Sequence, residues 1–190
     1  MIVYIHGFNS SPQSHKARLL CERLTSIGRE AEFACPALSH RPAQAMAQLK
    51  TLIEAPAHAR ITLVGSSLGG YYATALAEAA DVRAIVVNPA NTPHLGLRAY
   101  LGPQRNLYTG ESYELTEQHL QELADIYVPR LTQLERYFLM ATTGDEVLNY
   151  ATAVNRYAGA RQLIVHGSDH GYADFGDYLD QVLDFADLQN

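Results

Sequence analysis

The 190-residue sequence predicts an α/β fold in which a mostly parallel sheet of six strands is covered by helices on both faces. Six short apolar runs are nearly continuous rather than alternating, as is typical of strands buried on both sides. Segments with helical spacing separate these runs, so strand and helix alternate along most of the chain. The composition, 47% hydrophobic and 18% charged, is that of a globular protein. We therefore expect one compact domain over residues 1–190.

The apolar runs are the predicted strands. Most of them are rich in β-branched or aromatic residues and have the length of a short buried strand. They lie at residues 2–5, 31–34, 61–64, 84–87, 137–140 and 163–165.

Apolar residues spaced three or four apart predict the helices between the strands. Glycine follows two of these segments, at the position where helices commonly end. The segments are 20–27 before Gly28, 46–53, 72–79, 147–154 before Gly159, and 175–186.

The alternation breaks between residues 89 and 135, which form an insertion. The insertion begins with irregular, proline-rich and glycine-rich sequence and then predicts a helix over residues 116–127. Thr116 is its expected N-cap, and Leu115 and Leu120 are placed to form a hydrophobic staple. Because an insertion of this length is usually functional, 89–135 is a candidate lid; a purely structural elaboration is the alternative.

Charge and composition exclude several classes of function. The net charge of −6 argues against a nucleic-acid-binding protein. We expect neither a secretory signal nor a membrane-spanning segment, and hence a cytoplasmic protein. Cys21 and Cys35 lack metal-ligand spacing and are expected to be reduced thiols. The sequence contains neither a metal-binding cluster nor a dinucleotide fingerprint, so we expect no metal and no cofactor.

Residues 65–69 read GSSLG and fit the pattern G-x-S-x-G, between a predicted strand and a segment compatible with a helix. In that context Ser67 stands on a sharp turn as a candidate nucleophile, at a helix N-terminus that favours a developing oxyanion. A phosphate-binding loop is an alternative, but Tyr71 and Tyr72 stand where that motif needs lysine and a hydroxyl residue. A glycine-rich turn with solvated serines is a second alternative.

A nucleophilic serine needs an acid and a base, which follow it in the order acid, then histidine. Asp145 follows the predicted strand 137–140 and is the candidate acid, with Glu146 and Asp169 as competitors. His170 follows the strand 163–165 and is the candidate base. Its competitor His166 lies at the strand end, where its reach is shorter. Since the carboxyl ends of parallel strands line the ligand crevice, these loops can converge.

An oxyanion hole needs backbone donors from the turn after Ser67 and from the loop after the first strand. We expect the N–H groups of Leu68 and Phe8 to be these donors. The side chain of His6 is expected to fix the loop rather than to take part in the reaction.

Four motifs resemble the α/β-hydrolase superfamily: HGF at 6–8, GSSLGG at 65–70, GDEV at 144–147 and SDHGY at 168–172. Three further segments, at 5–17, 37–42 and 87–90, are similar to the small bacterial YqiA-type (UPF0227) esterases. The resemblance implies a serine esterase that cleaves carboxylic esters through an acyl-enzyme, with Ser67, Asp145 and His170 as its triad. The usual first strands of larger hydrolases are missing, which removes no catalytic loop.

The substrate is less determined than the reaction. A small acyl ester is the first expectation and an acyl thioester the second, because both use the same triad; a non-catalytic binding protein is a third interpretation. Apolar residues of the insertion are expected either to line the acyl group of the substrate or to pack on the core; they are Tyr100, Leu101, Leu107 and Tyr108. Three arginines are expected either to bind an anionic leaving group or to be solvated; they are Arg41, Arg98 and Arg105.

Overall fold

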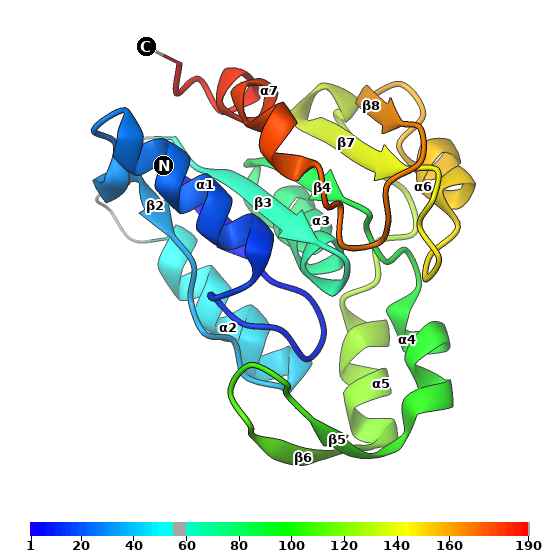
Figure 1. Ribbon diagram of the computed structural model, residues 1–190. Helices are drawn as coiled ribbons and strands as arrows, with labels where there is room; N and C mark the ends of the chain where they lie inside the picture. The colour runs from blue at the N-terminus through cyan, green and yellow to red at the C-terminus, as the bar shows by residue number, and fades with distance from the viewer. Residues whose placement is uncertain (55–59, 190) are drawn as a thin grey trace.

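The computed structural model describes residues 1–54 and 60–189. In this part of the chain a six-stranded sheet has the order β2-β1-β3-β4-β7-β8, and every pair of neighbours is parallel, as predicted (Figure 1). Its strands are β1 (Ile2–Ile5), β2 (Phe33–Ala34), β3 (Thr62–Ser66), β4 (Arg83–Val87), β7 (Tyr137–Thr142) and β8 (Arg161–Val165).

Helices cover both faces of the sheet, because successive strand residues point to opposite sides and both sides are apolar. Side chains such as Val3 and Leu63 pack with α2, α3 and α6, whereas Tyr4 and Val64 pack with α1 and α7. The helices are α1 (His15–Ser26), α2 (Pro42–Ile53), α3 (Leu68–Ala80), α4 (Pro93–Gly96), α5 (Glu117–Asp125), α6 (Tyr150–Arg156) and α7 (Leu179–Phe185).

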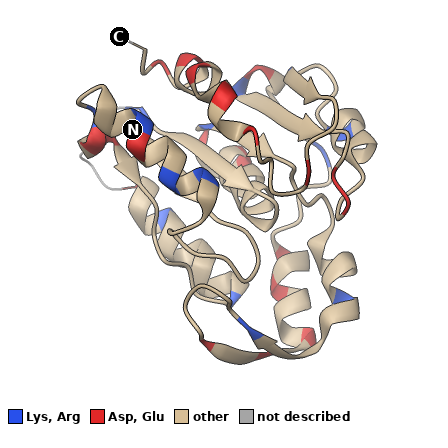
Figure 2. Ribbon diagram, viewed as in Figure 1, with Lys and Arg blue, Asp and Glu red and all other residues tan. Residues whose placement is uncertain are grey.

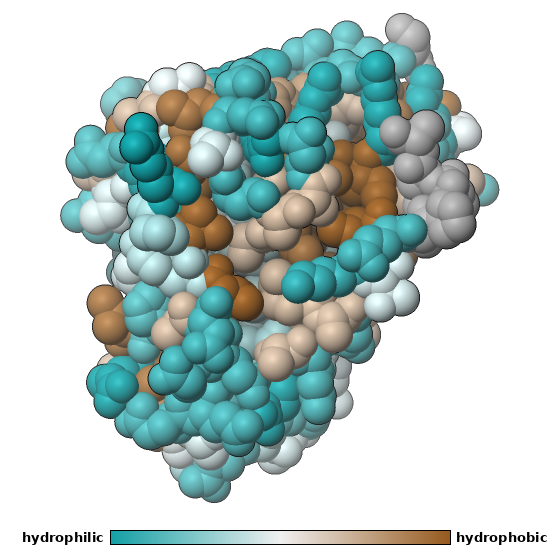
Figure 3. All heavy atoms as spheres, turned by 180° about the vertical axis from the view of Figure 1, so that it is seen from behind, coloured by the Kyte–Doolittle hydropathy of each residue, from teal (hydrophilic) through white to brown (hydrophobic). Residues whose placement is uncertain are grey.

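Four short 3-10 helices complete the helical elements of the described residues: Glu30–Glu32, Leu97–Tyr100, Leu134–Arg136 and Phe175–Tyr178. The last of them takes up the first turn of the helix predicted over 175–186. None of the described helices combines the length and the apolar character needed to cross a membrane. Seen from behind, apolar atoms reach a largely hydrophilic surface in several separate places (Figure 3).

The insertion contains the predicted helix and a hairpin that the sequence did not predict. Helix α5 begins directly after Thr116, whose N–H donates to His119 Nδ1 at 3.1 Å, and both proposed staple residues, Leu115 and Leu120, are buried. Strands β5 (Gly102–Arg105) and β6 (Ser112–Leu115) form a separate antiparallel pair. In Figure 1 the insertion extends from the carboxyl-end side of the main sheet.

Candidate active site

Ser67 lies on a strained turn between β3 and α3. Its backbone has φ 55° and ψ −118°, a conformation that a residue with a side chain rarely adopts. The neighbouring strand β4 and the residues after it hold the turn from both sides: Ser67 N–H donates to Val87 O at 3.0 Å, and Ala90 N–H donates to Ser67 O at 3.1 Å. These hydrogen bonds hold Ser67 in the strained conformation, which places the serine at the end of the sheet.

The glycines around Ser67 are required by close approach of the backbone. A Cβ on Gly65 would lie 2.2 Å from Gly69 O, and a Cβ on Gly69 would lie 1.9 Å from Ile5 O. Both separations are far shorter than the distance between any two non-bonded heavy atoms. The G-x-S-x-G pattern is thus a packing requirement of a strand, turn and helix that touch one another.

The structure brings Ser67, His170 and Asp145 together from the ends of β3, β8 and β7. His170 Nε2 lies 3.1 Å from Ser67 Oγ, and His170 Nδ1 lies 2.8 Å from Asp145 Oδ2. Both are hydrogen-bonding distances, so the imidazole bridges the hydroxyl and the carboxylate.

Asp145 is buried, with its side chain 1% exposed, and its carboxylate is well provided with donors. Besides His170, the N–H groups of Val147 and Leu148 donate to Asp145 Oδ1 at 2.8 and 2.7 Å. Burial alone raises the pKa of the carboxyl, but these hydrogen bonds outweigh burial and hold the Asp145 pKa below its usual range. Asp145 is therefore an anion that can orient an imidazole and stabilise an imidazolium.

Within the described residues, the alternative acids and base make no hydrogen bond to the His170 ring. Glu146 Oε2 accepts the backbone N–H of His170 at 3.0 Å, and Asp169 Oδ1 accepts the N–H of Ala173 at 3.1 Å. His166 is exposed at the end of β8. Of the acids and bases considered from the sequence, His170 is the one that contacts Ser67 Oγ, and Asp145 is the one that contacts the His170 ring.

Asn88 supports the loop that carries His170, and the sequence analysis did not single it out for this role. This buried residue follows β4, and its Nδ2 lies at hydrogen-bonding distance from Thr142 Oγ1 and from the carbonyl oxygens of Asp169 and His170, at 3.1, 3.2 and 3.3 Å. A polar residue that ends an apolar run was the available signal. Its partners lie more than 50 residues further along the chain.

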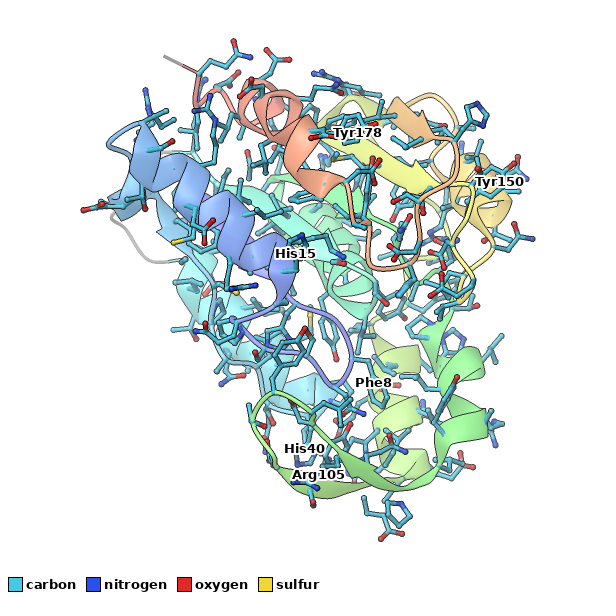
Figure 4. The ribbon with its side chains drawn as sticks, viewed as in Figure 1. Phe8, His15, His40, Arg105, Tyr150 and Tyr178 are labelled. Carbon is cyan, nitrogen blue, oxygen red and sulfur yellow. The ribbon has the colours of Figure 1, made fainter. Side chains whose placement is uncertain are left out.

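The loop after β1 faces the same turn. Neither the Phe8 nor the Leu68 N–H donates a hydrogen bond within the described residues, and Leu68 is the first residue of α3, where an N–H has no intrahelical acceptor. His6 ties the loop to the next segment, because Leu38 N–H donates to His6 Nε2 at 3.3 Å. Figure 4 labels Phe8 in this loop and His15 at the start of α1.

Two cavities lined by described residues meet at Ser67, Phe8 and His170. One, of about 430 Å³, is mainly apolar and lies on the β4 side, where its walls include Pro93, Leu97, Tyr100, Val147 and Leu148. The other, the β1-side cavity, is about 290 Å³ in volume and is lined mainly by residues with polar side chains, which include Tyr4, Ser10, Ser14, His15, Lys16 and Ser66. Because β1 and β4 flank β3, the nucleophile candidate stands between the two cavities.

The substrate residues suggested by the sequence are only partly near these cavities. Tyr100 lines the cavity on the β4 side and Tyr108 lines the β1-side cavity, whereas Leu101 and Leu107 line neither. The three arginines also line neither cavity: Arg41 pairs with Glu122, Arg98 pairs with Glu117 at 2.9 Å, and Arg105 is exposed. Lys16 and Ser66, which the sequence analysis did not propose for binding, lie closer to Ser67.

The alternative of a phosphate-binding loop does not fit the turn. Tyr71 and Tyr72 are buried in α3, and Tyr71 OH donates to Leu123 O at 2.6 Å. In residues 1–54 and 60–189, no group of three or more His, Cys, Asp or Glu side chains could hold a metal ion.

Comparisons with known proteins agree with this fold. The model of the family described as Uncharacterised protein family (UPF0227) matches residues 1–187. The chain is 24% identical over 155 residues to UPF0227 protein YcfP from Escherichia coli O139:H28, which covers 78% of this chain and 77% of YcfP.

Two solved structures are similar over nearly the whole chain. Alpha/beta hydrolase domain-containing protein 10 from mouse superposes with a TM-score of 0.70 at 17% identity, covering 96% of this chain and 89% of that protein. Est1E from Butyrivibrio proteoclasticus, with ferulic acid bound, gives a TM-score of 0.69 at 14% identity and coverages of 99% and 89%. The fold is therefore the α/β-hydrolase fold that the sequence resemblance implied.

Proposed function

Because the chain belongs to the UPF0227 family and has the α/β-hydrolase fold, we propose that it is a serine hydrolase that cleaves carboxylic esters. The proposal rests on one observation above all, the line of contacts from Ser67 Oγ through the His170 ring to Asp145. The strained turn under Ser67 adds weight, since such strain is typical of functional positions.

In the first half of the reaction, neutral His170 accepts the Ser67 proton at Nε2 as Oγ attacks the acyl carbonyl carbon. Asp145 accepts a hydrogen bond from His170 Nδ1–H, which fixes the tautomer of the ring and stabilises the imidazolium that forms. The imidazolium then gives its proton to the leaving alkoxide, so that the alcohol departs and the acyl group stays on Ser67.

In the second half, His170 removes a proton from water as the water oxygen attacks the acyl carbon. The imidazolium then returns this proton to Ser67 Oγ as the bond between Oγ and the acyl carbon breaks, which releases the carboxylic acid and restores the serine. Each tetrahedral intermediate carries a negative oxygen, and the Phe8 and Leu68 N–H groups are the proposed donors to it. A single such donor contributes about 10²–10³ in rate in enzymes of this type.

The test is labelling of the native protein with a fluorophosphonate probe, followed by peptide mapping. This probe reacts with activated serines and requires no knowledge of the substrate. We expect one adduct on Ser67, lost in Ser67→Ala and in His170→Ala. The matched control His166→Ala removes an exposed histidine four residues from His170 and should label at the wild-type rate.

Turnover distinguishes the reactions that share this chemistry. An ester and a thioester with the same acyl group are compared by kcat/KM, and we expect the ester to be preferred. A preference for the thioester would assign the second expected activity. A folded protein with no adduct and no turnover of either compound would overturn the proposal and favour a binding protein with this fold.

A further inference from the structure

The β1-side cavity beside Ser67 is lined by a buried cation that the proposed reaction does not use. Lys16 is 8% exposed and lies in the first turn of α1, and its Nζ donates to Gly171 O at 2.6 Å. An ammonium has three donors, so this contact satisfies only one of them. The side chain also lines the β1-side cavity, so its other two donors can meet an anion or another polar ligand there.

The structure provides no direct counter-ion for Lys16. Within residues 1–54 and 60–189, no carboxylate lies within 4.0 Å of its Nζ. Asp169 and Asp145 act on it from a greater distance, while burial, the larger effect, lowers the Lys16 pKa to about 8. The side chain is thus mainly protonated at pH 7. Figure 2 marks basic positions along α1 and acidic positions in the loops after β7 and β8.

Neutral hydrogen-bonding groups line the same cavity as this ammonium. Ser66, the other serine of the GSSLG turn, is 6% exposed and lines the same cavity, as does the phenol of Tyr4, which is 1% exposed. Burial raises the Tyr4 pKa, so the phenol remains a neutral hydroxyl. The first turn of α1 contains no acidic residue, and its N-cap residue Ser14 makes no side-chain capping bond. The partial positive charge of this helix end is therefore not offset locally.

We propose that this cavity is a carboxylate-binding subsite, in which Lys16 binds the carboxylate of an ester substrate whose apolar part occupies the cavity on the β4 side. This proposal rests on the proposed function. One ammonium and neutral hydroxyl groups match a group with a single negative charge. Since the two cavities meet at Ser67, a substrate that fills both places its ester bond at the nucleophile.

The first experiment compares esters that differ only in this charge. Alkyl monoesters of dicarboxylic acids place a carboxylate on the acyl side, and acyl esters of hydroxy acids place it on the alcohol side. Each ester is compared with a neutral analogue in which this free carboxylate is a primary amide. We expect kcat/KM to favour the acid over the amide by about 10-fold to 100-fold on one side, as a charge-assisted hydrogen bond predicts. In Lys16→Met this ratio should fall to about 1.

Two variants make the result specific. Arg18→Met removes the same charge from an exposed position of α1 and should keep the acid-to-amide ratio. Lys16→Arg keeps the charge and should retain a measurable preference for the acid. Equal losses for acid and amide in Lys16→Met would assign Lys16 to positioning the His170 loop through Gly171, and would overturn the subsite.

Binding without turnover separates this proposal from the proposed function. Calorimetry measures the affinity of an alkyl monocarboxylic acid and of its amide for the wild type and for Lys16→Met. A preference for the acid that depends on Lys16 supports the subsite even if no ester is hydrolysed. Equal affinities for acid and amide in the wild type would overturn it, whatever the labelling of Ser67.

Discussion

The His170 ring has a defined partner at each nitrogen, and Asp145 is what defines its orientation. The buried carboxylate accepts hydrogen bonds from two backbone N–H groups and faces His170 Nδ1. These contacts fix the orientation of the carboxylate and, through it, that of the ring. An asparagine of nearly the same shape would keep the packing but remove the charge that an imidazolium needs.

We therefore expect Asp145→Asn to lower kcat by about 10⁴ with little change in the thermal midpoint of unfolding. Steady-state kinetics on any ester that the wild type cleaves measures this loss. Glu146→Gln is the matched comparison, since Glu146 accepts only the backbone N–H of His170, and it should cost less than about 10-fold. A loss in Glu146→Gln as large as in Asp145→Asn would contradict the assignment of the acid.

Lys16 gives the stability of the protein a predictable dependence on pH. Its pKa is about 8 in the folded protein against an ordinary value of 10.5, so the folded state releases this proton first as pH rises. Between those values the unfolded chain binds more protons, and the free energy of unfolding contributed by this residue increases with pH. From pH 8 to pH 10.5 the wild type should gain about 1–3 kcal/mol relative to Lys16→Met.

Denaturant unfolding at several pH values measures this difference, with Arg18→Met as the exposed control that should run parallel to the wild type. A difference between wild type and Lys16→Met that is constant across this range would show that Lys16 titrates at its ordinary pKa in the folded protein.

The residues that could be predicted from the sequence are those with a local signature. Ser67 lies in a five-residue pattern, and Asp145 and His170 follow apolar strands in the expected order. Lys16 has no such signature, because its site exists only after Gly171, 155 residues away, packs against it. In the sequence it is one basic residue ahead of the helix predicted over 20–27.

The element that fixes the nucleophile is the unit of β3, the turn and α3, and its glycines are the most sensitive positions. We expect Gly69→Ala to destabilise the protein by at least about 2–3 kcal/mol, because the new Cβ would lie 1.9 Å from a backbone oxygen of β1 and a strand cannot yield by that much. At this chain length the thermal midpoint should fall by about 6 °C or more.

Gly96→Ala is the matched control for this loss. Gly96 ends α4 with an ordinary helical φ, and an added Cβ would meet nothing within 4 Å. This variant should unfold at the wild-type temperature or slightly above it. Equal midpoints for Gly69→Ala and the wild type would mean that β1 and α3 are not in close contact.

The sheet was easier to predict than the insertion for a physical reason. Strands covered on both faces are rich in apolar residues, and each of the six predicted runs overlaps a strand of the sheet. The predicted run 31–34 is too long, because Glu30–Glu32 form a 3-10 helix and β2 is only Phe33–Ala34. The hairpin strands β5 and β6, which read GPQR and SYEL, are half-exposed, and their ladder does not join the main sheet. Their sequence therefore lacks the apolar run that indicates a strand.

At the scale of the whole molecule, the insertion attaches to the body in two different ways. Helix α5 buries Leu120 and Leu123, receives the Tyr71 hydroxyl on Leu123 O, and pairs Glu122 with Arg41. The hairpin instead makes polar contacts with the loop after β1. Tyr113 OH donates to Asn9 Oδ1 at 2.8 Å, and Asn106 Nδ2 donates to Ser10 O at 2.8 Å.

The contacts of the hairpin are fewer and more polar than those of α5, so we expect the hairpin to be the more mobile part of the insertion. Leu107 and Tyr108 at the hairpin tip are 85% and 55% exposed, and Tyr108 lines the β1-side cavity. Since regions with few buried apolar contacts open most easily, backbone amides of residues 102–115 should exchange with solvent at least about 10-fold faster than those of α5. Hydrogen exchange followed by mass spectrometry measures both segments in one sample.

An alkyl carboxylic acid that fills the cavities should slow exchange in the hairpin and leave α5 unchanged, because the ligand lies under Tyr108 and not beside α5. In Lys16→Met the same acid should lose this effect, which ties the motion of the hairpin to the occupied cavity. If α5 exchanges as fast as the hairpin, the whole insertion opens as one body and the division drawn from its contacts is wrong. If the hairpin is as protected as α5, it is a fixed wall of the cavity, and substrates must enter from the β4 side.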